Sequence, residues 1–327
     1  MKQSLTMLLL LTLLLSGCGI AVPAPEPPEE NLTVIGISQV GAESDWRVAN
    51  SESMKQVFRE EHGYRLLYED ARQIQENQIM AVRKFIQQKV DYIILMPISE
   101  TGWDSVLQEA QDAEIPVILV DRMVNVADES LYTAHVGSDF RKQGQKATDW
   151  MATRYDQADE IIDIIHIQGT MGSTAQIGRT TALEEAVQAH ENWQILTQLD
   201  GDFTQAKTFE TLSGYLMQLP PEQDIDVVYC ENDNEAFGAI EALENFGYHC
   251  GTDVDVICFD ATRNCLKLCM EGKIALAVEC NPLLGPLAEE IIRTMENGTI
   301  PQKHHYVEEQ IFTREILTEA LIAQRKY

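Results

Sequence analysis

The chain has 327 residues, enough for two domains with sizeable cores, and 45% of them are hydrophobic, an ordinary share for a globular protein. Its formal net charge is −28, and its sequence pI is about 4.5. A surface this acidic repels nucleic acid and anionic membrane, so we expect neither to bind the folded surface directly.

The first 30 residues are predicted to direct export rather than to join the fold. Lys2 precedes a leucine-rich run, and Leu15-Ser16-Gly17-Cys18 resembles a bacterial lipobox. This pattern predicts a signal peptide over residues 1–17, cleavage before Cys18 and lipidation of Cys18, with an ordinary signal peptide and a chance cysteine as the alternative. Residues 18–30, rich in proline and glutamate, are predicted to be an extended tether. The protein would then lie outside the cytoplasm, on the outer face of the cell membrane or in the periplasm.

From residue 31 onward, short apolar runs alternate with amphipathic stretches, which is typical of βαβ units. In the first half we predict strands over 33–37, 65–69, 92–96, 117–120 and 131–136, and helices over 46–62, 75–88, 103–113 and 139–154. The alternation restarts with strands over 161–167, 194–199, 226–230, 254–259, 275–278 and 306–312, and helices over 174–189, 203–219, 233–246, 263–271 and 283–297. The fold predicted is α/β, with two doubly wound parallel-sheet lobes and a ligand cleft between them.

Charged residues directly follow the buried strand at 117–120. Asp121 can accept two hydrogen bonds and Arg122 can donate several from a planar fork, which suits a ligand with adjacent hydroxyl groups. A structural ion pair at a strand end is the alternative interpretation. Side chains at the carboxyl ends of parallel strands face the crevice where such sheets bind ligands, and this favours a binding role.

Other strand ends carry further candidates for the same cleft. Trp46 could pack on the apolar face of a sugar ring, or merely cover the edge of a lobe, while Arg47 could bond the hydroxyls. The glycine-rich run 169–173 lacks the lysine of a phosphate-binding loop, so we interpret it as a tight turn that lets Arg179 reach the cleft. Asn232 suits a helix cap or a ligand contact, and Asp260 and Glu279 add carboxylates.

No catalytic motif is found: the chain has no Gly-x-Ser-x-Gly elbow, no His-Glu-x-x-His and no dinucleotide fingerprint. We expect His304 and His305 to be solvated in a polar loop. Apart from Cys18, six cysteines fall in the second half, and we predict core packing for them, with one disulfide as an alternative and a metal site disfavoured. Three arginines and three carboxylates in the cleft favour a neutral ligand with many hydroxyls.

From residue 31 to the end, the chain resembles the sugar-binding proteins of bacterial ABC transporters, the ribose-binding and LacI-like family, and most closely its galactofuranose-binding members. The resemblance rests on segments spread along the chain, at 37–47, 75–79, 101–103, 113–117, 119–122, 168–170, 201–204, 232–233, 278–282 and 285–286. Asp45 and the pair Asp260-Ala261, where the family has Asp-Gly, depart from it, and Asp45 leaves the exact sugar open.

The resemblance implies a periplasmic-binding-protein-like fold with a three-segment hinge. Its first lobe would span 31–137 plus 281–308, and its second 138–280 plus 309–327. It also implies sugar contacts for a set of residues that includes Phe203: Trp46, Arg47, Asp121, Arg122, Arg179, Phe203, Asn232, Asp260 and Glu279.

We therefore expect a monomeric binding protein, not an enzyme, that needs no cofactor or metal. It would capture a monosaccharide, galactofuranose or a related furanose or pentose, and deliver it to an ABC transporter permease. The alternative is a sugar sensor that signals through a membrane histidine kinase. An enzyme would need converging carboxylates or a metal site, and a cytoplasmic repressor is opposed by the lipobox and the lack of a DNA-binding headpiece.

Overall fold

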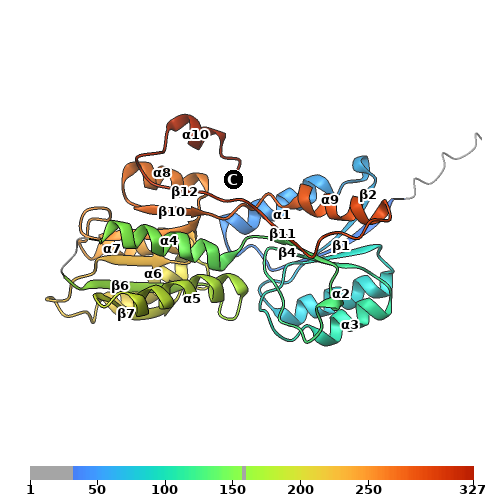
Figure 1. The fold of residues 1–327 in the computed structure, drawn as a ribbon, viewed down its shortest axis with the longest axis horizontal. Coiled ribbons are helices and arrows are strands. Elements are labelled where there is room, and N and C mark those ends of the chain that lie inside the picture. The colour runs from blue at the N-terminus through green and yellow to red at the C-terminus, as the bar shows by residue number, and fades with distance from the viewer. Residues whose placement is uncertain (1–31, 157–159) are drawn as a thin grey trace, which may run out of the picture. The chain divides into compact units, whose positions relative to one another are not determined.

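The computed structural model describes residues 32–156 and 160–327, so the predicted signal peptide, Cys18 and the tether lie outside the described residues (Figure 1). The first half contains β1 (Thr33–Gln39), α1 (Asp45–Val57), β2 (Tyr64–Asp70), α2 (Gln75–Gln88), β3 (Tyr92–Leu95), α3 (Asp104–Asp112), β4 (Val117–Val120), β5 (Ala134–Gly137) and α4 (Phe140–Arg154). The second contains β6 (Ile162–Gln168), α5 (Thr174–Ala189), β7 (Trp193–Asp200), α6 (Gln205–Leu216), β8 (Val227–Cys230), α7 (Asp233–Asn245), β9 (Asp255–Asp260), α8 (Arg263–Glu271), β10 (Leu276–Glu279), α9 (Gly285–Glu296), β11 (His304–Tyr306), β12 (Ile311–Phe312) and α10 (Glu319–Gln324).

The strands form two sheets of six, each the centre of one lobe. The sheet of lobe one has the order β11-β5-β4-β3-β1-β2, and all its pairings are parallel. The sheet of lobe two has the order β12-β10-β9-β8-β6-β7 and is parallel except where β12 pairs with β10. The two lobes lie at the right and left of Figure 1. The predicted fold class of two α/β lobes is confirmed.

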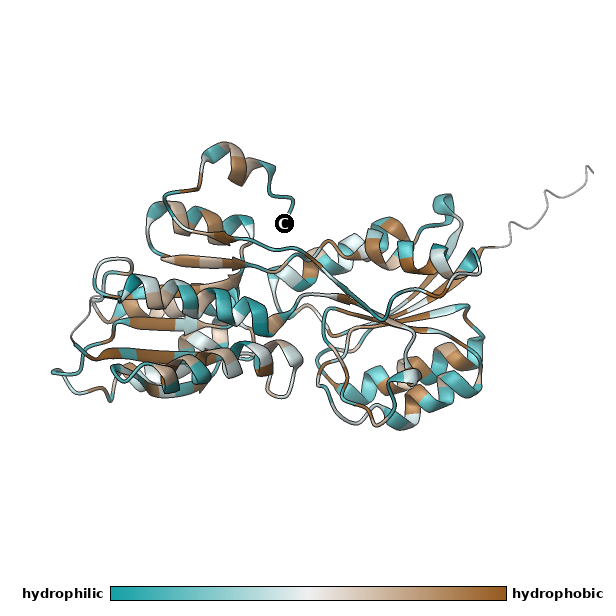
Figure 2. Cartoon of the chain, viewed as in Figure 1, coloured by the Kyte–Doolittle hydropathy of each residue, from teal (hydrophilic) through white to brown (hydrophobic). Residues whose placement is uncertain are grey.

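Both sheets are buried on both faces, as unbroken apolar strands require. In lobe one, α1 and α9 pack with one face of the sheet and α2 and α3 with the other. In lobe two, α4 and α5 cover one face, and α6, α7 and α8 cover the other. The apolar strands and the more polar helix surfaces are visible in Figure 2. Among residues 32–156 and 160–327, no helix is both long and apolar enough to cross a membrane.

The end of the chain corrects one sequence prediction. Residues 306–312 do not form a single strand, because β11 joins the sheet of lobe one and β12 joins the sheet of lobe two. The four residues between them carry the chain from one lobe to the other. The expectation that His304 and His305 are solvated is also wrong: both are half-buried in β11, and the ring of His304 stacks on Tyr306 at 5.8 Å.

Candidate ligand-binding site

One cavity gathers residues from both lobes around about 270 Å³ of space, open solvent included. Eight residues that the sequence suggested line it: Trp46, Arg47, Asp121, Arg122, Arg179, Phe203, Asn232 and Asp260. Five lining residues were not predicted: Glu43, Ser44, Phe140, Ala175 and Cys280.

The carboxyl ends of the strands bring these residues together. Asp121 directly follows β4, Asn232 lies two residues after β8, and Asp260 ends β9. The loop after β1 supplies Glu43 and leads into α1, where the Ser44 hydroxyl accepts a hydrogen bond from the backbone N–H of Arg47 at 3.2 Å. This cap fixes the start of the helix and with it the direction in which Arg47 leaves the backbone.

Positive φ values occur at the ends of β4 and β9 and in the loop after β7. Asp121, Phe203, Asp260 and Ala261 have φ values of 67°, 58°, 100° and 58°. Side chains other than glycine rarely adopt positive φ because Cβ crowds the backbone. Strain of this kind persists where the surrounding structure fixes the residue, and it is common in ligand sites. It also gives a physical reason why a glycine would suit position 261.

Lobe one contributes a buried network of ion pairs, and its pairing corrects the sequence interpretation. Asp121 pairs with Arg47 at 2.8 Å, not primarily with its neighbour Arg122, whose Nε lies 3.9 Å away. Arg122 instead donates to Glu43 at 2.7 Å, and Arg47 donates to the same Glu43 oxygen at 3.1 Å. Each carboxylate is therefore held by an arginine that lies far from it along the chain or on the following helix.

Burial and charge act in opposite directions on the two arginines. Burial would lower the pKa of Arg47, but the neighbouring charges of Asp121 and Glu43 outweigh it, and the pKa is raised above its ordinary value. For Arg122, burial lowers the pKa despite the nearby carboxylate of Glu43.

Three polar atoms of this network have no hydrogen-bond partner within the described part of the chain. They are Glu43 Oε2, Arg47 Nη1 and Arg122 Nε, and all three are buried. A buried unpaired polar atom is costly, more so on a charged group. One acceptor and two donors around a single cavity match ligand hydroxyls, since each hydroxyl can both donate and accept.

Lobe two contributes a wall whose hydrogen bonds are made within the protein. Arg179 donates through Nε and Nη2 to Gln143 Oε1, at 3.2 and 2.8 Å, and through Nη1 to the carbonyl of Glu231. Its Nη2 lies 3.8 Å from Asp260 Oδ1. Burial raises the pKa of Asp260 well above its ordinary value, although the charge of Arg179 opposes this.

Asn232 is first of all a helix cap. Its Oδ1 accepts from the backbone N–H of Glu235 at 2.8 Å, and the backbone N–H of Asn232 donates to Glu235 Oε2 at 3.0 Å, which completes a capping box. The Asn232 Nδ2 donates to the carbonyl of Phe203 at 3.1 Å. Both ends of the Asn232 amide are thus held by hydrogen bonds within the protein.

The glycine-rich turn serves the protein itself. The N–H of Gly169 donates to Glu231 Oε2 at 2.8 Å, and a Cβ at Gly169 would lie 2.0 Å from the ring of Phe203. Only glycine lets Phe203 reach the cavity, where the Arg122 guanidinium lies 5.2 Å from its ring centroid. The predicted tight turn is present, because the N–H of Ser173 donates to the carbonyl of Thr170 at 3.1 Å.

Aromatic faces complete the lining. The Trp46 indole N–H donates to the carbonyl of Cys280 at 2.7 Å, and the guanidinium of Arg47 lies 4.7 Å from the Trp46 ring centroid. Trp46, Phe140, Ala175, Phe203 and Cys280 form one apolar cluster that draws on both lobes. Apolar faces beside convergent polar groups are typical of sites for small polar ligands.

Glu279 does not join this cavity. Its Oε1 accepts from Arg325 Nη1 at 2.5 Å and from the Tyr327 hydroxyl at 3.1 Å, while Oε2 accepts from the N–H of Gln310 at 3.0 Å. The side chain of this residue at the end of β10 is directed to the C-terminal segment, and we withdraw it from the candidate ligand contacts. Glu43 takes its place as the third carboxylate, so the cavity still holds three arginines and three carboxylates.

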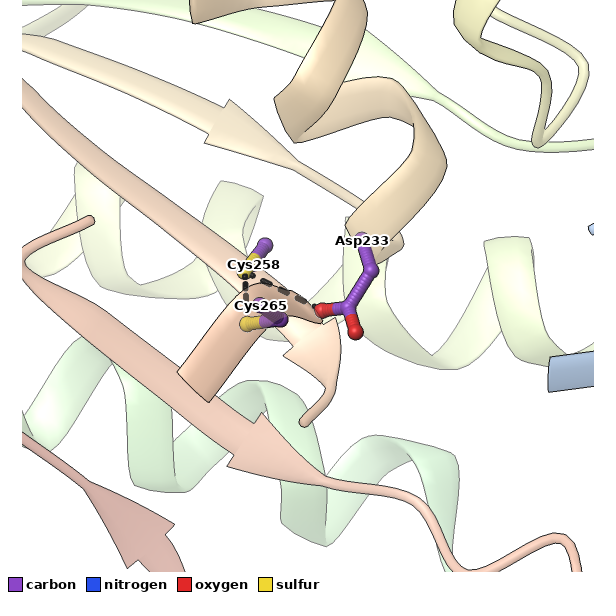
Figure 3. A group of neighbouring side chains, drawn as sticks. All are labelled: Asp233, Cys258 and Cys265. Carbon is purple, nitrogen blue, oxygen red and sulfur yellow. Dashed lines mark hydrogen bonds between the residues drawn. The ribbon is translucent and has the colours of Figure 1, made fainter. Parts of the chain in front are cut away.

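The cysteines of the described residues are free thiols, five of them buried and Cys250 half-buried. Two of them, Cys258 and Cys265, lie near Asp233, and one potential metal-ligand atom of each of the three residues lies within 4.8 Å of the other two (Figure 3). The group is satisfied internally, because the Cys258 thiol donates to Asp233 Oδ1 at 3.3 Å and Thr262 donates twice to Oδ2. Core packing with thiol hydrogen bonds accounts for these residues.

A signal for Glu43 was available in the sequence. It lies four residues before Arg47, a spacing that pairs side chains near a helix start. Gln143 and Phe140 had no such signal, because they lie on the first turn of α4, whose approach to the cavity depends on the packing of the two lobes.

Comparison with known proteins supports a common family. Residues 35–293 match the family described as the periplasmic binding protein domain. The galactofuranose-binding protein YtfQ of Escherichia coli is 36% identical over 82% of this chain and 84% of its own. A Mycobacterium smegmatis protein in complex with β-D-fucofuranose is 38% identical, covers 86% of this chain and 91% of its own, and superposes with a TM-score of 0.82. The arabinose-transporter binding protein of Shewanella sp. ANA-3, bound to L-arabinofuranose, is 37% identical over 90% of this chain and 96% of its own, with a TM-score of 0.84.

Proposed function

Because this chain belongs to the periplasmic binding protein family, we propose that it is an extracytoplasmic solute-binding protein that captures one monosaccharide in its furanose form. The observation that carries this proposal is the set of unpaired polar atoms around one cavity, Glu43 Oε2, Arg47 Nη1 and Arg122 Nε. Arg47 and Arg122 are each paired with a carboxylate of the same cavity, and this favours a neutral ligand over an anion.

The ring form of the sugar is inferred from the relatives. Their names give galactofuranose, fucofuranose and arabinofuranose, which share a five-membered ring and differ in the groups attached to it. The contacts that we propose for such a ring are Trp46, Arg47, Asp121, Arg122, Arg179, Phe203, Asn232 and Asp260, with Glu43 added. Trp46 and Phe203 pack on its apolar faces, and the charged groups bond its hydroxyls.

Delivery and location complete the proposal. The hinge lies at the three connections between the sheets, so lobe one spans 31–137 plus 281–308 and lobe two spans 138–280 plus 309–327; the strand order of the two sheets supports this division. Closure of the lobes around the sugar creates the surface that an ABC transporter permease recognises. A lipid on Cys18 holds the protein, as a monomer, at the outer face of the membrane.

The test is calorimetric titration of residues 31–327 with D-galactose, D-fucose, L-arabinose and D-ribose, and with myo-inositol as a polyol that has no furanose form. We expect saturable binding of at least one of the first three sugars and none of myo-inositol. The ring form of the bound sugar is then assigned from the anomeric carbon signal of ¹³C-labelled sugar. A bound pyranose, or heat with myo-inositol alone, would overturn the furanose assignment, and no heat with any compound would overturn the function.

A matched pair of variants ties the binding to this cavity. Glu43→Gln keeps the shape but removes a charged acceptor, and a hydrogen bond to a charged group contributes about 1.5–3 kcal/mol, so the affinity should fall about 10- to 150-fold. Glu52→Gln makes the same change at a side chain that is 55% exposed on the same segment and should leave the affinity unchanged.

A further inference from the structure

The carboxylate of Glu309 joins all three connections between the lobes. Glu309 lies between β11 and β12, in the third connection. Its Oε1 accepts from the Ser138 hydroxyl at 2.6 Å, in the first connection, and from the backbone N–H of Asn281 at 2.9 Å, in the second. Its backbone carbonyl accepts from Lys146 Nζ at 2.5 Å. A single side chain therefore holds together the segments that must bend if the lobes move.

The second oxygen of this carboxylate leads toward the cavity. Glu309 Oε2 accepts from Gln143 Nε2 at 2.7 Å, and the same nitrogen donates to the carbonyl of Glu279 at 3.1 Å. On its other side, Gln143 Oε1 accepts both hydrogen bonds from Arg179, which lines the cavity. The Gln143 side chain is buried, and its donor and acceptor ends are both in use.

We infer that Gln143 and Glu309 are positioning residues that couple the placement of Arg179 in the occupied cavity to the three connections of the hinge. This inference rests on the proposed function, because it assigns the coupling to the binding of a sugar. A ligand shifts a conformational equilibrium only through contacts that differ between its two states. Arg179 is a cavity residue that is connected to the hinge through the side chains of Gln143 and Glu309.

The hydrogen bonds of Gln143 explain why Arg179 and Glu309 would move together. If Arg179 withdrew from Gln143, the buried amide oxygen would lose both of its donors. If Gln143 turned to follow Arg179, its Nε2 would leave Glu309 Oε2 and the carbonyl of Glu279. Either movement leaves buried polar groups unpaired, so the members are expected to move together or not at all.

The first test needs no ligand. In the full-length protein, Arg179→Met removes the cavity end of the relay, and hydrogen exchange at the Asn281 amide, which is bonded to Glu309, should become at least tenfold faster. Arg141→Met removes an exposed arginine of α4 that pairs with Glu185 and should leave that exchange unchanged. Arg179→Lys serves as a second variant if the methionine variant does not fold. Unchanged exchange in the Arg179 variants would overturn the inference.

The second test uses whichever of D-galactose, D-fucose or L-arabinose binds the parent protein. Glu309→Gln replaces one acceptor oxygen by an amide N–H, which then faces a side chain or backbone group that also donates. This substitution should weaken sugar binding about tenfold, whereas Glu308→Gln, at the exposed neighbouring residue, should leave it unchanged. In a Gln143→Leu background the effect of Glu309→Gln should vanish, because the relay is already cut. Additive effects of the two substitutions would overturn the inference. If no sugar binds the parent, the proposed function fails, and the exchange measurement alone decides on the relay.

Discussion

The two walls of the cavity bury the same kinds of side chain but leave them in different states. On the wall of lobe one, Glu43, Arg47 and Arg122 each keep one buried polar atom without a partner in the described residues. On the wall of lobe two, Arg179 uses all three of its nitrogens on protein acceptors, and Asn232 uses both ends of its amide. The first wall has hydrogen-bonding capacity left for a ligand, whereas the second is assembled in advance and linked to the hinge.

The largest expected effect comes from breaking the network of lobe one. Arg47→Met would leave Asp121 without its closest partner and Glu43 with only Arg122. Removing one member of a buried ion pair costs about 3–5 kcal/mol, because the remaining charge stays buried. Urea unfolding should show a loss of that size, while Arg59→Met, at an exposed pair with Glu61, should change the stability by less than about 1 kcal/mol. Equal losses in the two variants would contradict the proposed network.

Acid should weaken lobe one through His135. Burial lowers the pKa of this histidine to about 4, although its bond to the Asp121 carbonyl opposes the shift. The unfolded chain binds the proton near pH 6.5, so the contribution of His135 to stability is present above pH 6.5 and is lost as the pH falls toward 4. The loss is at most about 3 kcal/mol.

The measurement is the free energy of unfolding in urea at several pH values. His135→Gln should lack the part of the pH dependence between pH 6.5 and 4 that the parent shows. His62→Gln, at an exposed histidine of the same lobe, should keep it. A parent curve with the same slope as that of His135→Gln would show that this histidine is not held neutral.

A smaller loss of stability is expected from a substitution on the wall of lobe two, and it tests whether that wall binds the ligand less strongly than the wall of lobe one. Asn232→Ala removes the cap of α7, which costs about 1 kcal/mol, and we expect the sugar affinity to change less than it does in Glu43→Gln. Asn232→Ser, which retains a capping oxygen, should recover most of the stability. A loss of affinity larger than that of Glu43→Gln would mean that Asn232 is a dominant ligand contact and not mainly a cap.

The smallest effect is expected at Ala261. Glycine there would relieve a left-handed backbone conformation that costs an alanine about 1–2 kcal/mol, but it would add about 0.5–1 kcal/mol of unfolded-state entropy and remove a buried methyl group. Ala261→Gly should therefore change the free energy of unfolding by less than about 1 kcal/mol, whereas Ala110→Gly, inside helix α3, should be clearly destabilising.

Many of the residues that line the cavity could be predicted from the sequence, for a physical reason. Strands such as Val117–Val120 are apolar throughout, and polar residues at their carboxyl ends must meet at one edge of a parallel sheet, so Asp121, Arg122, Asn232 and Asp260 could be placed before the structure. The same reasoning failed for Glu279, because β10 is the strand next to β12, and the end of β10 is covered by the C-terminal segment.

Pairing within the site was harder to predict. Sequence neighbours suggested that Asp121 binds Arg122, but the observed partners of the two residues come from α1 and the loop before it. The split of residues 306–312 between two sheets was missed because it depends on where the chain crosses between the lobes. The pattern of apolar and polar residues within 306–312 does not indicate where the chain crosses.

The position of β11 and β12 near the end of the chain determines when each sheet can be completed during synthesis. The sheet of lobe one begins with β1 but gains its edge strand only at residues 304–306, after all five parallel strands of lobe two have been synthesised. The sheet of lobe two closes a few residues later, at 311–312. Neither lobe can be finished from a nascent chain, and neither can be excised as one continuous fragment. The pairing of β11 with β5 joins residue 304 to residue 135, and a pairing so distant along the chain is expected to slow folding.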